Sequence, residues 1–179
     1  MVFVDDCIFC QIAQKKILSQ IVYEDENFIA FLDIHPANKG HTLVIPKNHV
    51  TDLNELKEDV AKELFSIVQR VAHGVQKATN ADAFNIIQNN GPAAGQIVPH
   101  VHIHVIPRFE KDGLSLGVFR QGKYEGNEIA SIANAIKSKI PEKKVEEKIE
   151  KVEPVEKEEK PKKRSAQEVR HIRKEVEIA

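Results

Sequence analysis

The sequence predicts an α+β fold for residues 1–140 of the 179-residue chain, followed by a charged segment over residues 141–179. Three observations support this fold class. Histidines alternate strictly with aliphatic residues between His100 and Pro107, which is typical of a half-buried β-strand. Apolar residues recur at helical spacing between Leu53 and Val75. The apolar fraction of 41% is also enough to fill one core in a chain of this length.

The expected elements follow from these periodicities. A short helix is expected over residues 7–15 and a long amphipathic helix over residues 53–75. A closing helix is expected to begin at an Asn127 cap and to carry the apolar residues Ile129, Ile132, Ala133 and Ile136. Five strands are expected, at residues 21–24, 28–33, 42–46, 84–88 and 101–107.

The overall charge excludes some partners. A formal net charge of −1 gives no reason to expect attraction to nucleic acid or to a membrane surface. No apolar run approaches transmembrane length, and the first residues lack the basic segment and apolar segment of a signal peptide. We therefore expect a cytoplasmic protein with no membrane partner and no specific nucleic-acid partner.

Residues 141–179 differ in composition from the rest of the chain. They contain 12 Lys or Arg and 11 Asp or Glu, with no aromatic residue and no glycine. Such a Lys/Glu/Pro-rich sequence buries too little apolar surface to offset chain entropy, so we expect a disordered or partly helical tail. A short helix could form over residues 165–178, and the basic cluster at 160–164 could contact a polyanion, but a solvated extension is the simpler interpretation. The sequence names no partner for this tail.

The alternating segment places three imidazoles on one surface. Side chains of a strand alternate, so His100, His102 and His104 share one face while the aliphatic residues between them face the core. Neighbouring histidines would then lie about 6.5–7 Å apart, which suits a metal site or a row of groups around one phosphate. The Gly- and Asn-rich loop at residues 89–99 could direct backbone N–H groups toward an anion held there. A fourth histidine, His41, opens another expected strand.

The two cysteines of the chain form a separate motif. Cys7 and Cys10 have the spacing of half a zinc site. A thioredoxin-like redox pair would require a preceding strand, which this N-terminus lacks. Two reduced, half-buried thiols remain an open alternative.

Several segments together resemble the histidine triad (HIT) superfamily, in particular its Hint-like and bacterial or archaeal branch. They are the histidine segment itself, Gly95-Gln96-Ile97-Val98 before it, Phe31-Leu32-Asp33-Ile34, and the ten residues from Gly40 to His49. The resemblance covers residues 6–108. It implies an antiparallel sheet of about five strands with one long helix and a C-terminal helix. It also implies a homodimer and a nucleotide site that acts on phosphorus.

The resemblance implies that His102 is a nucleophile that attacks the α-phosphate of a nucleotide. His104 and His41 would donate hydrogen bonds to phosphate oxygens or assist the leaving group. Neutral imidazole is nucleophilic near pH 7, and a nucleotidyl-histidine intermediate divides one difficult displacement into two easier steps. One ring nitrogen must stay unprotonated, so a backbone carbonyl that accepts from the other nitrogen would fix the tautomer.

The resemblance also implies the nucleotide contacts. Asp33 would accept hydrogen bonds from the ribose hydroxyls. Phosphate would be bound by Asn89 and by the backbone of Gly95, Gln96 and Ile97. The base would lie between the apolar residues Ile8, Phe9, Ile12, Phe31 and Ile34. Many Hint-like members carry a hydroxyl residue where this chain has Ile97, so a side-chain hydrogen bond to the leaving group is absent.

A zinc ion is the one cofactor that the resemblance implies, and no organic cofactor is expected. Zinc-containing members are similar to this chain in joining the two cysteines with two histidines, here His49 and His100. The four ligands Cys7, Cys10, His49 and His100 would form a closed site, which is structural and not catalytic. For the histidines of the strand, a catalytic metal centre is the main alternative to a nucleophile.

The expected function is that of a nucleotide hydrolase or nucleotidyl transferase. Its substrates would be purine nucleoside 5′-monophosphate derivatives of the phosphoramidate type. A dinucleoside polyphosphate hydrolase would use the same nucleophile on a longer phosphate chain. A nucleotide-sensing or scaffold protein with incidental turnover is the alternative from a different class.

Overall fold

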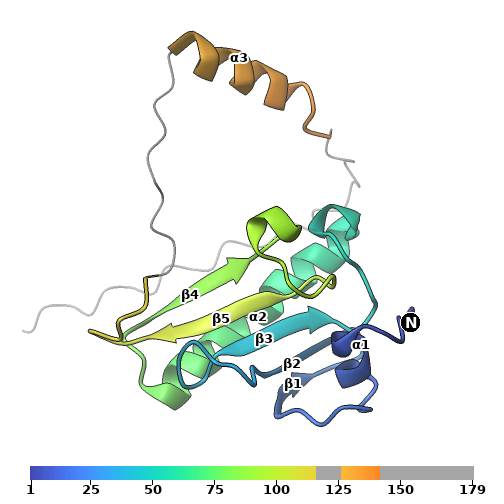
Figure 1. Cartoon of the computed structure of the whole chain (residues 1–179), viewed down its shortest axis with the longest axis vertical. Coiled ribbons are helices and arrows are strands. Elements are labelled where there is room, and N and C mark those ends of the chain that lie inside the picture. The colour runs from blue at the N-terminus through green and yellow to red at the C-terminus, as the bar shows by residue number, and fades with distance from the viewer. Residues whose placement is uncertain (116–125, 142–179) are drawn as a thin grey trace, which may run out of the picture. The chain divides into compact units, whose positions relative to one another are not determined.

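A computed structural model describes residues 1–115 and 126–141 (Figure 1). The chain divides into two units, Met1–Arg120 and Gln121–Ala179. Apart from Pro141, the expected tail, with its possible helix and its basic cluster, lies outside the described residues. No helix of the described residues is long and apolar enough to cross a membrane.

The first unit is built on a five-stranded antiparallel sheet, which confirms the expected α+β class. The strands have the spatial order β1-β2-β3-β5-β4, and every neighbouring pair is antiparallel. Strand β5 lies between β3 and β4, so the histidine segment leads into an interior strand of the sheet. The strands are β1 (Ile21–Glu24), β2 (Phe28–Leu32), β3 (Thr42–Pro46), β4 (Ala83–Gln88) and β5 (Ile103–Arg108).

Helix α2 (Glu58–Thr79) covers one face of this sheet (Figure 1). Its buried residues recur every three or four positions, and they are Leu64, Ile67, Val68, Val71 and Ala72. They form one core cluster with sheet residues that include Val101, Ile103 and Val105. The aliphatic residues of the alternating segment therefore face the core, as the sequence predicts.

Helix α1 (Ile8–Ala13) contributes to a second core cluster. Phe9, Cys10 and Ile12 pack there with apolar residues of β2 and β3. The histidine side of the alternating segment is also covered, since His100 is fully buried and His102 is 5% exposed. At His100 and His102 the expected half-buried face is therefore wrong, because these rings pack against other side chains, including Phe9, and not against solvent. His104, in β5, is half-buried as expected.

Several element ends differ from the expected ones. The long helix begins at Glu58 and not at residue 53, because Asp52 caps a separate 3₁₀ turn over Leu53–Glu55 by accepting from the Asn54 N–H. Leu56 is extended but still packs against the core, which explains why it matches the helical periodicity. Strand β5 begins at Ile103 and not at residue 101, and the Val101 N–H donates to the Val50 carbonyl instead.

The second unit contains helix α3 (Gly126–Lys137). This helix begins one residue before Asn127, so Asn127 lies in its first turn and does not precede it. The Asn127 side-chain oxygen accepts from the N–H of the next residue at 2.8 Å. A closing helix is thus present, but the expected cap is wrong, because Asn127 is the second residue of the helix.

Candidate active site and metal-binding cluster

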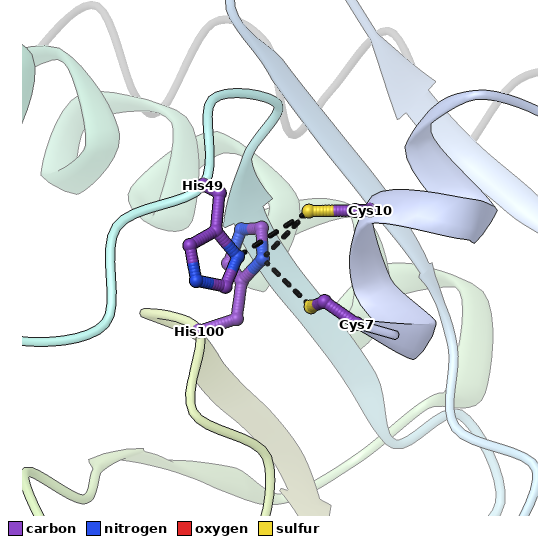
Figure 2. A group of neighbouring side chains, drawn as sticks. All are labelled: Cys7, Cys10, His49 and His100. Atoms are coloured by element: carbon purple, nitrogen blue, oxygen red, sulfur yellow. Dashed lines mark hydrogen bonds between the residues drawn. The ribbon is translucent and has the colours of Figure 1, made fainter. Parts of the chain in front are cut away.

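Cys7, Cys10, His49 and His100 come together from three segments of the chain (Figure 2). The cysteines lie at and within the first turn of α1, His49 follows β3, and His100 precedes β5. The sulfur of Cys7 lies 3.4 Å from Nδ1 of His100. The sulfur of Cys10 lies 3.3 Å from Nδ1 of His49 and 3.7 Å from Nδ1 of His100. We call these four residues the metal cluster.

The donor set and the spacing of the metal cluster fit a zinc ion. With Zn–S bonds of about 2.3 Å and Zn–N bonds of about 2.0 Å, a tetrahedral site separates sulfur from nitrogen by about 3.5 Å. The three measured distances of 3.3, 3.4 and 3.7 Å lie close to this value. Nε2 of His100 donates to the Pro46 carbonyl at 2.9 Å, so Nδ1, which faces the sulfurs, has no proton.

Burial sets the charge states in the metal cluster. It lowers the pKa of His100 to about 4, so this ring is neutral at pH 7, as a metal ligand must be. Burial also raises the pKa of the Cys10 thiol. A nearby cation would therefore be needed to hold Cys10 as the thiolate that binds zinc.

His102 has a defined tautomer. Its Nδ1 lies 2.6 Å from the carbonyl oxygen of His100. A carbonyl oxygen can only accept, so the proton is on Nδ1 and Nε2 keeps its lone pair. The acceptor that the nucleophile requires is therefore present, and it belongs to the neighbouring histidine of the alternating segment.

His41 and His104 form a directed pair of rings. The Ala37 N–H donates to Nδ1 of His41 at 3.2 Å, so the proton of His41 is on Nε2. That Nε2 lies 2.9 Å from Nδ1 of His104 and donates to it. The proton of His104 is consequently on Nε2, and the centroid of its ring lies 5.0 Å from that of His102. An N–H donor thus belongs to the ring beside His102.

Both rings of this pair are kept neutral. Burial, helped by the neighbouring His102 and His41 and opposed by Asp33, lowers the pKa of His104 to about 4. Burial likewise lowers the pKa of His41, again opposed by Asp33. At pH 7, His104 is therefore a neutral hydrogen-bond donor and not a cation.

Asp33 follows β2, and its two carboxylate oxygens have different surroundings. Oδ1 accepts from the His35 N–H at 2.9 Å, which turns the chain. Oδ2 lies 3.5 Å from Nδ1 of His41. The ligand atoms of a second group, Asp33, His41 and His104, are also close enough to hold a metal ion. However, the ring nitrogens of His41 and His104 that face each other already share a hydrogen bond.

The glycine-rich loop before the histidines holds itself together. The Gly95 N–H donates to the Pro92 carbonyl at 3.0 Å, and the Gln96 N–H donates to the Gly91 carbonyl at 3.2 Å. Gly91 and Gly95 have φ values of +82° and +87°, which glycine adopts without steric cost. The N–H groups of Gly95 and Gln96 are therefore already hydrogen-bonded in this conformation, whereas the Ile97 N–H makes no hydrogen bond with the described residues.

The side chains of this loop divide into inward and outward ones. Gln96 is 9% exposed; its Oε1 accepts from the Gly91 N–H at 2.7 Å and its Nε2 donates to the Thr51 carbonyl at 2.9 Å. Ile97 is 92% exposed. The Asn89 amide borders the loop, 3.7 Å from the position that a Cβ on Gly95 would occupy. Gln96 thus anchors the loop, and Ile97 offers an apolar surface.

The five apolar residues assigned to the base fall into two groups. Ile8 and Ile34 are exposed and offer surface to a ligand. Phe9, Ile12 and Phe31 are buried in the cluster beneath α1, as plain core residues would be. The ring of Phe9 also contacts the ring of His102, with centroids 5.2 Å apart.

Sequence reasoning predicted a backbone acceptor for His102 but missed the backbone groups that fix the tautomers of His41 and His100. The Ala37 N–H and the Pro46 carbonyl each orient one histidine. Backbone N–H and carbonyl groups do not depend on residue type, so the sequence does not show which of them will contact a histidine. The inward anchoring by the Gln96 side chain was missed as well, although a glutamine inside a glycine-rich loop is a visible feature.

The fold and the histidine cluster together define a class of protein, and comparison with known proteins identifies it. The family model of the HIT domain matches residues 14–111, and the chain belongs to this family. A HIT-like protein of Methanocaldococcus jannaschii is 50% identical over 109 residues, which are 60% of this chain and 82% of that protein. Adenosine 5′-monophosphoramidase hnt1 of Schizosaccharomyces pombe is 38% identical over 135 residues, covering 75% and 98% of the two chains. Adenylylsulfatase HINT3 of Arabidopsis thaliana is 42% identical over 110 residues, covering 62% and 56%.

Solved structures of the family agree with this assignment. A HIT-family protein from Bacillus subtilis matches with a TM-score of 0.73 and 37% identity, covering 78% of this chain and all of that one. A zinc-bound histidine triad family protein from Mycobacterium smegmatis matches with a TM-score of 0.59 and 37% identity, covering 74% and 97%.

Proposed function

We propose that this chain is a HIT-family nucleotide hydrolase or nucleotidyl transferase that acts on the α-phosphate of purine nucleoside 5′-monophosphate derivatives of the phosphoramidate type. The observation that carries the proposal is the tautomer of His102, whose Nε2 keeps its lone pair because Nδ1 donates to the His100 carbonyl. The relatives named adenosine 5′-monophosphoramidase and adenylylsulfatase support the substrate class.

The proposed reaction has two steps. Nε2 of His102 attacks the α-phosphorus, the N–P bond forms, and the bond to the leaving group breaks with its electron pair on the leaving group. The Nε2–H of His104 donates to a phosphate oxygen or to the departing atom. Water then attacks the phosphorus, and the N–P bond breaks with its electron pair returning to Nε2 of His102. The water proton goes to Nε2 of His104 if that ring has given its own proton to the leaving group, and otherwise to solvent, and the nucleoside monophosphate is released. His102 returns to its starting tautomer.

A substitution of His102 tests the enzymatic proposal. His102→Ala removes the attacking nitrogen, so we expect hydrolysis of adenosine 5′-phosphoramidate to fall at least about 1,000-fold while AMP still binds. His73→Ala, at an exposed position of α2, is the matched control and should keep wild-type turnover. Equal, slow turnover by the wild type and His102→Ala would instead favour a nucleotide-sensing protein. A panel with adenylyl sulfate and diadenosine polyphosphates would show which leaving group is preferred.

We also propose that the metal cluster holds a structural zinc ion. Its support is the ligand geometry of the four side chains and the zinc-bound relative from M. smegmatis. When bound, zinc would hold the two cysteines as thiolates and crosslink three segments of the chain. Elemental analysis of protein purified without added metal should give about one zinc per chain. Protein that is stably folded and free of zinc as purified, before any treatment with a chelator, would contradict the proposal.

We propose a homodimer that forms along the edge of the sheet. Strand β4 is an edge strand of the sheet, and its Phe84 and Ile86 are exposed. An exposed apolar edge is a template for pairing with a second strand, and two-fold pairing of β4 with its own copy would cover it. Light scattering should give the mass of two chains, and Ile86→Lys should shift the protein toward one chain. A cytoplasmic location remains a prediction from the sequence.

A further inference from the structure

The metal cluster and the proposed nucleophile meet at His100. On its side-chain end, Nδ1 of His100 lies 3.4 and 3.7 Å from the two cysteine sulfurs. On its backbone end, the His100 carbonyl accepts the proton that fixes the tautomer of His102, at 2.6 Å. One fully buried residue therefore belongs to both groups. A rotation of the His100 backbone would change the hydrogen bond that orients His102.

Phe9 makes a second connection between the two groups. It lies between Cys7 and Cys10 in the chain and is 7% exposed. Its ring meets the ring of His102 edge-to-face, with centroids 5.2 Å apart and planes at 70°. It meets the ring of His100 in the same way, at 5.9 Å and 76°. Any displacement of α1 that follows the two thiols would also displace the surface against which His102 packs.

The metal cluster contains few other contacts that could hold it together. The contacts within it are three sulfur–nitrogen approaches and an edge-to-face contact between the rings of His49 and His100, whose centroids lie 5.1 Å apart. Sulfur is a weak hydrogen-bond partner. The strongest separate anchor of the His100 ring is its hydrogen bond to the Pro46 carbonyl. A metal ion would replace weak contacts by four bonds and would restrict α1 and His100 together.

We propose that Phe9 and His100 are positioning residues that tie the orientation of His102 to the metal cluster, so that metal binding and nucleotide binding strengthen each other. The proposal rests on the proposed function in requiring that a nucleotide binds at His102 and that the metal cluster binds zinc. Thermodynamic linkage makes the effect reciprocal: the factor by which AMP tightens zinc binding equals the factor by which zinc tightens AMP binding.

The test measures zinc affinity of the full chain by competition with a chelator, with and without saturating AMP. We expect AMP to tighten zinc binding about 5-fold or more, within the usual range of coupling between two sites. Separate titrations of AMP into zinc-loaded and zinc-free protein should give the same factor. Equal zinc affinities with and without AMP would overturn the proposal and leave the proposed function standing. Failure of AMP to bind in either metal state would overturn both.

Phe9→Leu isolates the connection through the aromatic ring. It retains all four metal ligands and His102, and we expect the coupling factor to fall toward 1. Loss of a direct contact between Phe9 and the base would instead weaken AMP equally in both metal states and leave the factor unchanged, which would overturn the role of Phe9. The matched control is Phe28→Leu, because Phe28 is fully buried in the other core cluster, beside α2. It should keep the wild-type factor.

A second measurement covers the case in which zinc-free protein does not fold. In the zinc-loaded protein, ¹⁵N NMR should show His102 protonated on Nδ1 in the wild type and in Phe28→Leu. Phe9→Leu should show a mixture of the two tautomers, since the packing that favours the Nδ1–carbonyl hydrogen bond is reduced. A single Nδ1–H tautomer in all three proteins would overturn the role of Phe9 as a positioning residue.

Discussion

At the scale of single residues, the chemistry of the site depends on which nitrogen of each histidine carries a proton. Backbone groups make this decision for three rings: the His100 carbonyl for His102, the Pro46 carbonyl for His100, and the Ala37 N–H for His41. His104 then follows His41 through their shared hydrogen bond. Four chemically identical side chains thereby acquire four different surroundings, which are those that the proposed metal ligand, the proposed nucleophile, a donor and the group that orients the donor require.

The lowered pKa of His104 predicts a pH dependence of stability. Its pKa is about 4 in the folded chain against 6.5 ordinarily, so between these values the unfolded chain binds a proton that the folded chain excludes. The free energy of unfolding should therefore fall as the pH decreases from about 6.5 toward 4, with a contribution from this residue of up to about 3 kcal/mol. Urea denaturation at a series of pH values measures this slope.

A substitution assigns this slope to His104. His104→Gln cannot take up the proton, so its stability should decline less steeply with acid than that of the wild type. His73→Gln, at an exposed position of α2, is the control and should keep the wild-type slope. Parallel slopes for His104→Gln and the wild type would show that this ring contributes nothing to the acid sensitivity.

Ile97 offers a prediction about the leaving group. Its side chain is 92% exposed at the loop that leads to the histidines, so a polar replacement should cost little stability. Ile97→Ser would place a hydroxyl there, and one added hydrogen bond to the leaving group should raise kcat/KM for adenosine 5′-phosphoramidate about 10-fold. Ile34→Ser, at another exposed apolar position, should not raise it. An unchanged kcat/KM in Ile97→Ser would remove this position from leaving-group recognition.

At the scale of elements, the sheet carries the site on the face that α1 covers, and α2 covers the opposite face. Strand β5 carries His104 and continues the segment of His100 and His102, while β3 begins at the residue after His41. Residues His104 and Leu43 are paired across β3 and β5, so His41 and His104 are brought to the same region of the sheet. Helix α1 supplies the cysteines on the histidine face, and α2 fills the opposite face.

The packing of α2 against the sheet predicts a large effect of one substitution. Leu64 is fully buried beside β-strand residues, so Leu64→Ala should lower the free energy of unfolding by about 3 kcal/mol through lost burial and a residual cavity. Leu18→Ala is the matched control, because Leu18 is 96% exposed and should change stability by less than about 0.5 kcal/mol. Chemical denaturation of both variants measures the difference. Similar losses would contradict the assigned core.

The element scale also shows how far sequence patterns extend. Strands β1 and β3 have the predicted bounds, because turn residues limit short runs of β-branched residues on both sides. The predicted start of α2 was wrong because Leu56 packs on the core without being helical. Apolar periodicity reports the burial of side chains and not the backbone conformation. The predicted start of β5 was wrong because the Val101 N–H donates to the Val50 carbonyl, and no local sequence pattern shows this tertiary contact.

At the scale of the whole molecule, we propose that residues 1–140 form the HIT domain and that residues 141–179 are an appended tail. Deleting residues 141–179 should leave dimerisation and turnover within about 2-fold of the full chain, because the tail sequence lacks the apolar residues needed to build a core. Light scattering and phosphoramidate hydrolysis measure the two properties. Loss of either would mean that the domain boundary lies further along the chain.

The sequence was sufficient for the fold class, for the family and, through the resemblance to that family, for the four residues that meet in the metal cluster. The three alternating histidines and the Cys7–Cys10 pair can be read locally from residue types at fixed spacings, whereas only the resemblance joined His49 and His100 to the two cysteines. Only the tertiary structure decided the separate surroundings of each imidazole, the burial of both faces at His102, and the inward anchoring of Gln96. The physical reason is that protonation states and burial depend on backbone groups and neighbours that are distant in the chain, and these leave no mark in the local pattern of residue types.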